Sequence, residues 1–359
     1  MDSTNKSKPL HHHPIPKYSI KPLPQYNKLF YNQKGWTGAD GSYSVKLSDD
    51  ITLWLYSDTW VSNITEDKQR KNATIINNSI ALQHGKDPLT SSVKFFWGDT
   101  KNGKPTAFIT PADDIGWFWL FNGIVIENKL YLFLMQTTQT DNKSVFGFKF
   151  IQTWLAQIEN PHDNPKKWRI TQHKLPWNKS PDDKLFFGSA LVKEGDFVYI
   201  YGYKEDKKQG RSMIIARTPA NRITDFKQWR FLSNGHWQTN MDNISNLFNG
   251  IATEYSVSYQ SSIKQYVAIY SENGMSKKIL ARFSPTPIGP WSSPYKLYEC
   301  PEYDWHQNYF CYAAKAHPTI SKEHDLIVTY VCNSTDFWQV AQDTRIYWPR
   351  FLNIKFSKN

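Results

Sequence analysis

The sequence has few cysteines and no long apolar run. Its 359 residues include three cysteines, Cys300, Cys311 and Cys332, which are too few for a disulfide framework. A Cys300–Cys311 bridge and three buried thiols both fit this spacing. No Cys/His spacing resembles a zinc site, so we expect no bound metal at these residues. No segment approaches the roughly 18 apolar residues that a membrane-spanning helix needs, so we expect no membrane span.

Motifs that bind nucleotides or activate a serine are missing as well. The chain has no Gly-rich phosphate loop, no dinucleotide-binding fingerprint and no Gly-x-Ser-x-Gly elbow. We therefore expect no cofactor. Residues 1–24 contain five prolines and lack the apolar central segment of a signal peptide, so these residues do not indicate a compartment.

Dense basic runs are also absent, although the formal net charge is +11. Lys and Arg are spread through the expected turns, which favours a solvated Lys-rich surface over a nucleic-acid-binding one. We therefore expect a monomer without a nucleic-acid partner. An acidic glycan as the partner of this charge stays open.

Aromatic residues are what the sequence holds in abundance. They make up 16% of the chain, with 15 Trp and 20 Tyr, and hydrophobic residues together make up 40%. Long Ala/Leu/Glu/Lys stretches of the helical type are missing. The composition therefore predicts an all-β protein with enough apolar side chains for a large core.

A strand pattern recurs five times along the chain. The strong candidates are Ile51–Tyr56, Leu130–Met135, Phe197–Tyr201, Gln265–Tyr270 and Asp325–Tyr330. Each follows a shorter strand and a turn, and the last of these shorter strands is expected at His317–Ile320. A unit of three to four strands repeated five times predicts a five-bladed β-propeller. Two stacked β-sandwiches are the alternative.

The repeats indicate one domain. We expect residues 1–26 to form a polar, Pro-rich, extended leader and residues 27–359 to form a single propeller. The alternating segment 345–356 has no hairpin partner after it, and we expect it to close the ring by pairing with the first blade. The sequence is compatible with a central channel that holds a structural cation and with one that holds none.

A β-hairpin formed by residues 41–47 and 51–57 is the most informative stretch. With a three-residue loop, one face is wholly apolar, and Asp40 lies directly opposite Asp58 at the open end. Two carboxylates at that distance cannot both ionise freely, so the pKa of one of them should rise. The hairpin therefore predicts paired-carboxylate chemistry. The structural alternatives are an Asp-Gly turn at Asp40 and a strand-ending Asp58.

Residues that open the innermost strands of a propeller should meet around one mouth of its channel. The expected group contains acids, amides, hydroxyls and one histidine, and suits a polyhydroxylated ligand: Asp40, Asn77, Asn78, Asn122, Ser189, Glu254, Lys315 and His317. We expect Glu254 to assist the acid pair. His317, Lys315, Ser189, Asn78 and Asn122 are candidates for substrate binding, against structural roles for each.

Some tryptophans should lie at this mouth, because aromatic faces stack on sugar rings. Trp36 and one of Trp117 and Trp119 are the best candidates for this role. Most of the other tryptophans are expected in the core between blades.

The chain resembles a known group at these residues. The segment GADGSYSVKLSDDITLWLYSDTW (38–60) looks like the opening motif of a bacterial domain long called "of unknown function", related to five-bladed propeller glycoside hydrolases. Similar segments span about residues 35–356: NNSIALQ (77–83), FNGIVIENKLYLF (121–133), FGSALVKEGDFVYIYG (187–202), IARTP (215–219), YAAKAHP (312–318) and YWPRF (347–351). Some members of that family are described as endo-D-arabinanases.

The resemblance implies that Asp40 and Asp58 are a catalytic pair. It implies a glycoside hydrolase that cleaves a bacterial polysaccharide, such as an arabinan-type furanoside, in a secreted or cell-surface location. Two functions from other classes stay open: a non-catalytic carbohydrate-binding propeller on cell-surface glycans, and a protein-interaction propeller.

Overall fold

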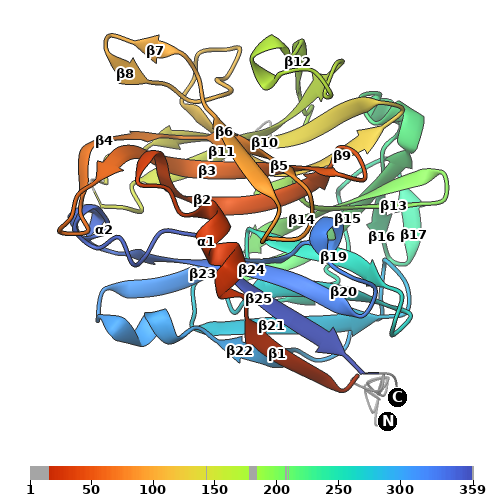
Figure 1. Ribbon diagram of the computed structural model, residues 1–359. Coiled ribbons are helices and arrows are strands. Elements are labelled where there is room, and N and C mark those ends of the chain that lie inside the picture. Colours follow the sequence, from red (N-terminus) through yellow and green to blue (C-terminus); the bar gives the residue numbers. More distant parts are fainter. Residues whose placement is uncertain (1–15, 143, 178–183, 207, 209, 358–359) are drawn as a thin grey trace.

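Five antiparallel sheets form a five-bladed β-propeller in the computed structural model (Figure 1), as the repeat predicted. The structure describes residues 16–142, 144–177, 184–206, 208 and 210–357. Among these residues, no helix combines the length and the apolar character that a bilayer crossing requires.

Each blade begins with its inner strand. Blade I contains β2 (Lys34–Lys46), β3 (Ile51–Ile64), β5 (Ser79–His84) and β6 (Ser92–Phe96), with β4 (Arg70–Ile76) on the far end of β3. Blade II contains β9 (Trp117–Ile126), β10 (Lys129–Gln139), β11 (Phe148–Ile158) and β12 (Ile170–Lys174). Blade III contains β13 (Leu185–Glu194), β14 (Phe197–Asp206), β15 (Gly210–Pro219), β16 (Arg230–Ser233) and β17 (His236–Gln238), with β18 (Phe248–Asn249) beside β15.

The last two blades are four-stranded. Blade IV contains β19 (Tyr255–Gln260), β20 (Gln265–Ser271), β21 (Lys278–Ser284) and β22 (Tyr295–Glu299). Blade V contains β23 (Tyr309–Ala316), β24 (Asp325–Ser334), β25 (Arg350–Phe356) and β1 (Tyr18–Pro22). Outside the blades lie the hairpin of β7 (Thr100–Lys101) and β8 (Lys104–Pro105), and the helices α1 (Pro24–Phe30) and α2 (Phe337–Gln342).

Short 3-10 turns connect several strands: η1 (Pro165–Lys167), η2 (Ala220–Arg222), η3 (Phe226–Gln228), η4 (Pro301–Trp305) and η5 (Pro318–Ile320). The last of these corrects a prediction, because His317–Ile320 was expected to be the inner strand of the fifth repeat. Pro318 has no N–H to donate to a sheet, and it begins the turn instead. The inner strand is β23, which ends at Ala316.

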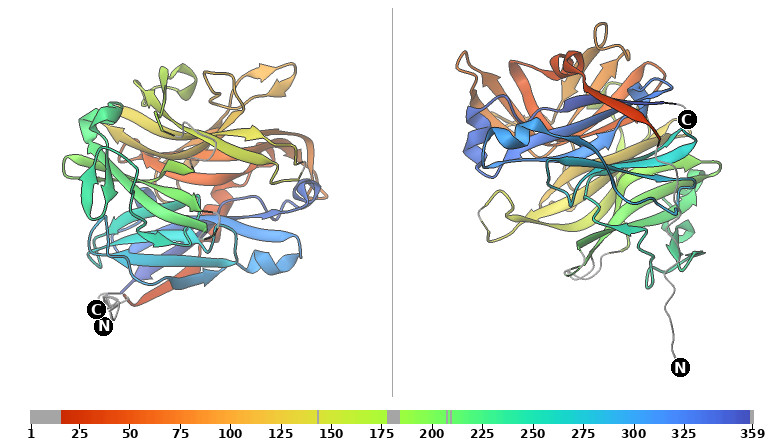
Figure 2. Two further views of the ribbon diagram at one scale, coloured as in Figure 1. Left: turned by 180° about the vertical axis from the view of Figure 1, so that it is seen from behind. Right: turned by 90° about the horizontal axis from the view of Figure 1, so that it is seen from below.

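The propeller closes within blade V. Strand β25 pairs with β24 on one side and with β1 on the other, in a register from Tyr18↔Phe356 to Pro22↔Leu352. The views agree in placing β1 (red) beside the last strands of the chain (blue; Figures 1 and 2). The expected pairing of the last strand with the first blade is therefore wrong. Strand β1 lies within residues 1–26, the segment that was expected to be an extended leader.

Helix α1 packs against blade V through two aromatic side chains. Tyr26 and Phe30 are buried, and both rings stack on Phe351 of β25, at centroid distances of 5.2 and 5.1 Å. This aromatic contact holds the N-terminal segment against blade V and keeps β1 in register with β25.

Candidate active site

The β2–β3 hairpin carries the two acids, and its register changes beside them. Near the turn, Tyr43 faces Leu55 and Val45 faces Leu53, as predicted. Beyond Tyr43 the pairing shifts, so that Gly41 faces Tyr56 and Ala39 faces Thr59. The register shifts three times between Trp36 and Tyr43, and the acids are therefore not a regular facing pair.

Glycine is required at this irregularity. Gly41 has φ +84°, and a Cβ there would lie 3.0 Å from the backbone N of Ser57. Ser42, the next residue, also lies in the left-handed region, with φ 59°. Such bulges turn a strand locally and redirect a side chain. Both Asp40 and Asp58 remain partly exposed.

Asp40 is bound by two phenols. Tyr312 of β23 donates a hydrogen bond to Oδ2 of Asp40 at 2.6 Å, and Tyr347 donates to the same oxygen at 3.1 Å. The other carboxyl oxygen, Oδ1, is buried without a partner among the described residues. Burial, the charge of Asp58 and the charge of Glu254 raise the pKa of Asp40 well above its usual range, while the phenol hydrogen bonds oppose this rise.

Asp58 has a different set of partners. Its Oδ1 accepts hydrogen bonds from Trp119 Nε1 at 2.8 Å and from Asn77 Nδ2 at 3.3 Å. Burial raises the pKa of Asp58 to about 6, against the lowering effect of these two hydrogen bonds. The charge of Asp58 acts on Asp40, so the two acids interact. Neighbouring charges raise the pKa of Asp40 but are not among the causes of the raised pKa of Asp58.

Glu254 lies near the pair and is neutralised by a buried cation. Its Oε1 is 2.8 Å from Nζ of Lys315, whose side chain is 0% exposed. The ammonium group also lies over the ring of Tyr43, 4.3 Å from its centroid. Burial lowers the pKa of Lys315, and the charges of Glu254 and Asp40 act in the opposite direction. A buried charge of this kind needs such a partner.

His317 lies in the interior and is fully buried. Its Nδ1 is 2.8 Å from Ser44 Oγ and its Nε2 is 2.7 Å from Thr329 Oγ1, so both ring nitrogens are occupied. The ring packs on Trp54, with centroids 4.8 Å apart. Burial, followed by the charge of Lys315, lowers the pKa of His317 to about 3, which keeps the imidazole neutral. This placement leaves no ring nitrogen for the substrate hydrogen bond that we expected.

Three other predicted residues are also buried and engaged. Asn78 donates to the carbonyls of Ile109 and Phe118 at 2.8 and 2.9 Å. Ser189 donates to the carbonyl of Thr253 at 2.8 Å. The Trp36 ring is 1% exposed and stacks on Phe95 with centroids 4.3 Å apart, so it does not form the expected rim.

The remaining two candidates are half-buried. Asn122 accepts a hydrogen bond from the Gly123 N–H at 2.8 Å, which occupies its carbonyl oxygen. Trp117 packs edge-on against Trp119, the tryptophan that binds Asp58, with centroids 6.2 Å apart. Of the two tryptophans considered for the mouth, Trp119 contacts an acid directly.

Two tyrosines were not among the candidate site residues. Tyr312 and Tyr347 open the segments YAAKAHP and YWPRF, so the sequence did contain a signal, but nothing in it placed either ring near Asp40. Tyr347 has φ 69°, and Ala313, next to Tyr312, has φ 58°. Such backbone conformations are strained and persist only where surrounding contacts hold them. Residues with these conformations cluster at functional sites.

A buried arginine supports the backbone around Tyr347. Arg70 donates to the carbonyls of Thr37 at 2.8 Å, Val340 at 2.5 Å and Ile346 at 2.9 Å. Gly38 leaves space there, since a Cβ on it would lie 2.3 Å from the Tyr347 carbonyl oxygen. Arg70 thus connects blade I to the segment that places a phenol on Asp40.

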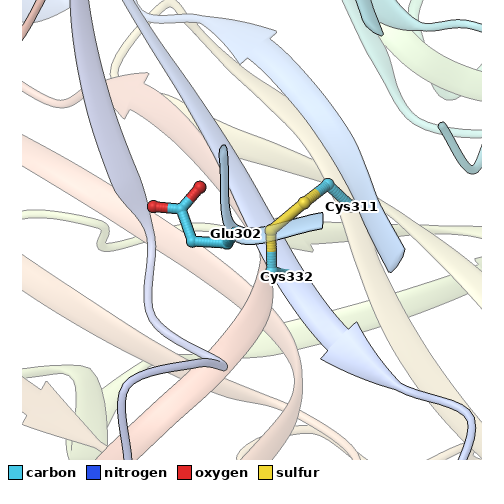
Figure 3. Close-up of side chains that lie close together, drawn as sticks. All are labelled: Glu302, Cys311 and Cys332. Atoms are coloured by element: carbon cyan, nitrogen blue, oxygen red, sulfur yellow. A yellow bond between two sulfur atoms is a disulfide. The ribbon is translucent and has the colours of Figure 1, made fainter. Parts of the chain in front are cut away.

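A second cluster, in blade V, contains Glu302, Cys311 and Cys332, groups of the types that bind metals (Figure 3). The two cysteines form a disulfide across β23 and β24, so their sulfurs are not thiolates. Glu302 accepts a hydrogen bond from Tyr330 at 2.7 Å. Cys300 is a free, buried thiol, so neither a Cys300–Cys311 bridge nor three thiols is present.

Comparisons with known proteins agree with this fold. A putative hydrolase from Bacteroides ovatus superposes with a TM-score of 0.75 at 18% identity, covering 94% of this chain and 90% of that one. The catalytic domain of the Coprinopsis cinerea GH62 α-L-arabinofuranosidase superposes with a TM-score of 0.51 at 8% identity, covering 95% and 97%. At these identities the likeness concerns the fold alone. No curated protein matches the sequence.

A family model matches residues 24–356, which is nearly the whole described chain. This match includes the hairpin with both acids and the segments that carry Tyr312 and Tyr347. The chain belongs to the family described as "Domain of unknown function (DUF5005)".

Proposed function

We propose that this protein hydrolyses glycosidic bonds in a bacterial polysaccharide, and that its substrate is an arabinan-type furanoside. The observation that carries the proposal is the pair Asp40 and Asp58, two interacting carboxyl groups with raised pKa values and different partners. Glycosidases use two carboxyl groups in this way, one as a proton donor and one as a base or nucleophile. Groups that share a site but differ in environment are the usual acid and base.

Asp40 suits the role of the acid. Burial and the charges of Asp58 and Glu254 raise its pKa well above the usual range, which favours the protonated form that a general acid needs. The phenols of Tyr312 and Tyr347 donate to Oδ2, which leaves Oδ1 as the oxygen that carries the proton of the neutral acid. The nearby charge of Glu254 contributes to the raised pKa of Asp40.

Asp58 suits the role of the base or nucleophile. The indole of Trp119 and the amide of Asn77 hold one of its oxygens and fix the plane of the carboxylate. Its other oxygen either activates water or attacks the sugar. Two observations support an arabinan-type substrate. The hairpin resembles that of endo-D-arabinanases, and the propeller fold is like that of the Coprinopsis cinerea α-L-arabinofuranosidase.

The test is digestion of a glycan panel that includes arabinan and arabinogalactan, with product sizes read by chromatography. Asp40→Asn and Asp58→Asn should each lower kcat at least about 100-fold, because acid–base groups contribute that much or more. Asp67→Asn, at an exposed turn residue, is the matched control and should keep the wild-type rate. Sugar binding without hydrolysis in the wild-type protein would support the non-catalytic propeller instead.

The pH dependence gives a second check of the same roles. Ionised Asp58 and protonated Asp40 are both required, so kcat/KM should rise as the pH increases through about 6 and fall at higher pH. A profile that is flat from pH 4 to pH 8 would exclude these roles.

A further inference from the structure

A hollow of about 530 Å³ lies between β4 and α2. The two elements are neighbours at the left of Figure 1. Its lining includes aromatic and amide side chains: Trp60, Gln69, Asn72, Phe337, Trp338 and Gln342. Its volume is in the range of ligand-binding sites.

The aromatic part of the hollow is exposed but held in place. Trp338 is 71% exposed, and Phe337 is 42% exposed. Phe337 stacks on the buried ring of Trp60, with centroids 5.3 Å apart and planes 27° apart. Asp336 caps the helix through the Trp338 N–H, and Val340 anchors it in the core. A large, exposed and positioned ring of this kind is a stacking surface.

The polar part of the hollow favours a hydroxylated ligand. Gln69, Asn72 and Gln342 offer amide donors and acceptors, which suit hydroxyl groups. The guanidinium of Arg70 also lines the hollow, but the carbonyls of neighbouring residues already bind it. Arg70 is therefore not a free cation, whereas Lys71, the other cationic side chain of the lining, is exposed.

The hollow is linked to the candidate active site through strand β3 and through Arg70. Trp60 follows Asp58 by two residues on β3, a distance of about 7 Å along a strand. On the other side, Arg70 binds the carbonyl of Ile346, the residue before Tyr347, which contacts Asp40. A glycan chain bound at the two acids therefore has the hollow within reach of its next sugar residues.

We propose that the β4–α2 hollow binds sugar residues of the same glycan chain, a few residues away from the cleaved bond, with one sugar ring stacked on Trp338. The inference rests on the proposed function for its choice of glycan. It makes the protein selective for long chains over short fragments.

The first test compares Trp338→Ala with the wild-type protein on arabinan and on an arabinotriose-sized fragment. The ratio of kcat/KM for the polymer to that for the fragment should fall about fivefold, the effect of one aromatic stacking contact. The control is Tyr259→Ala, which removes a different aromatic ring that is 49% exposed. This variant should keep the wild-type ratio. An unchanged ratio in Trp338→Ala would overturn the inference while leaving the proposed function standing.

The second test measures binding without turnover. Migration of Asp58→Asn through a native gel containing arabinan should be retarded, and adding Trp338→Ala should remove most of the retardation. Equal retardation of both proteins would refute the sugar site. Retardation that depends on Trp338, in a protein whose wild type cleaves none of the glycan panel, would refute the proposed hydrolysis but support the sugar site. If Asp58→Asn is not retarded and the wild-type protein cleaves none of the glycans, both the sugar site and the proposed hydrolysis are refuted.

Discussion

Replacing Asp58 with asparagine is expected to stabilise the protein at neutral pH. Burial raises the pKa of Asp58 from 3.8 to about 6. The folded protein therefore holds this proton more tightly than the unfolded chain does, and ionised Asp58 destabilises the fold. The effect is absent below about pH 4, grows as the pH rises toward 6, and is complete above about 6.

The magnitude follows from the shift. One pKa unit corresponds to about 1.4 kcal/mol, so a rise of roughly two units makes ionised Asp58 cost up to about 3 kcal/mol. Asparagine keeps an oxygen that can accept the Trp119 hydrogen bond and carries no charge. The free energy of unfolding of Asp58→Asn, minus that of the wild type, should therefore increase by up to about 3 kcal/mol between pH 4 and pH 8.

Guanidinium titrations followed by tryptophan fluorescence, at intervals of one pH unit, measure this difference. Asp67→Asn reports the effect of an amide at an exposed position. A difference between Asp58→Asn and the wild type that stays constant from pH 4 to pH 8 would refute the reasoning, because a buried carboxylate must act through its ionisation.

Two further predictions concern the groups that hold Asp40. Tyr312→Phe removes a hydrogen bond that lowers the pKa of Asp40, so the alkaline limb of the kcat/KM profile should move to higher pH; a profile with an unmoved limb would contradict this. Gly38→Ala should lower the free energy of unfolding by at least about 2 kcal/mol, because φ is +131° and the new Cβ would meet the Tyr347 carbonyl oxygen. Gly103→Ala, at φ +77° with no atom within 4 Å, is its control, and equal losses in thermal denaturation would show that contact with Tyr347 is irrelevant.

The blade repeat could be predicted from the sequence because it depends on local patterns. Alternating apolar residues and turns identified the second strand of every blade and the register near the turn of the first hairpin. Strand β1 could not be found in this way, because the leader is short, polar and rich in proline. Its pairing with β25 is a long-range contact that leaves no local pattern.

The candidate site was predicted in part, for a similar reason. Asp40 and Asp58 belong to one hairpin, so their proximity followed from local register. Tyr312 and Tyr347 are separated from Asp40 by 272 and 307 positions, and only the closed propeller brings them together. Asn78 and His317 are polar residues whose partners lie in the interior, and a single sequence does not distinguish such residues from ligand-binding ones.

The position of β1 has a consequence for shortened versions of this protein. A chain that starts at Leu23 would lack the outermost strand of blade V, and the backbone amides and carbonyls of Arg350–Phe356 on that side would be left open to water. Exposed strand edges of this kind join to one another between molecules. Truncated preparations should therefore self-associate before they lose their fold, and a crystallographer trimming the amino terminus should stop ahead of Tyr18.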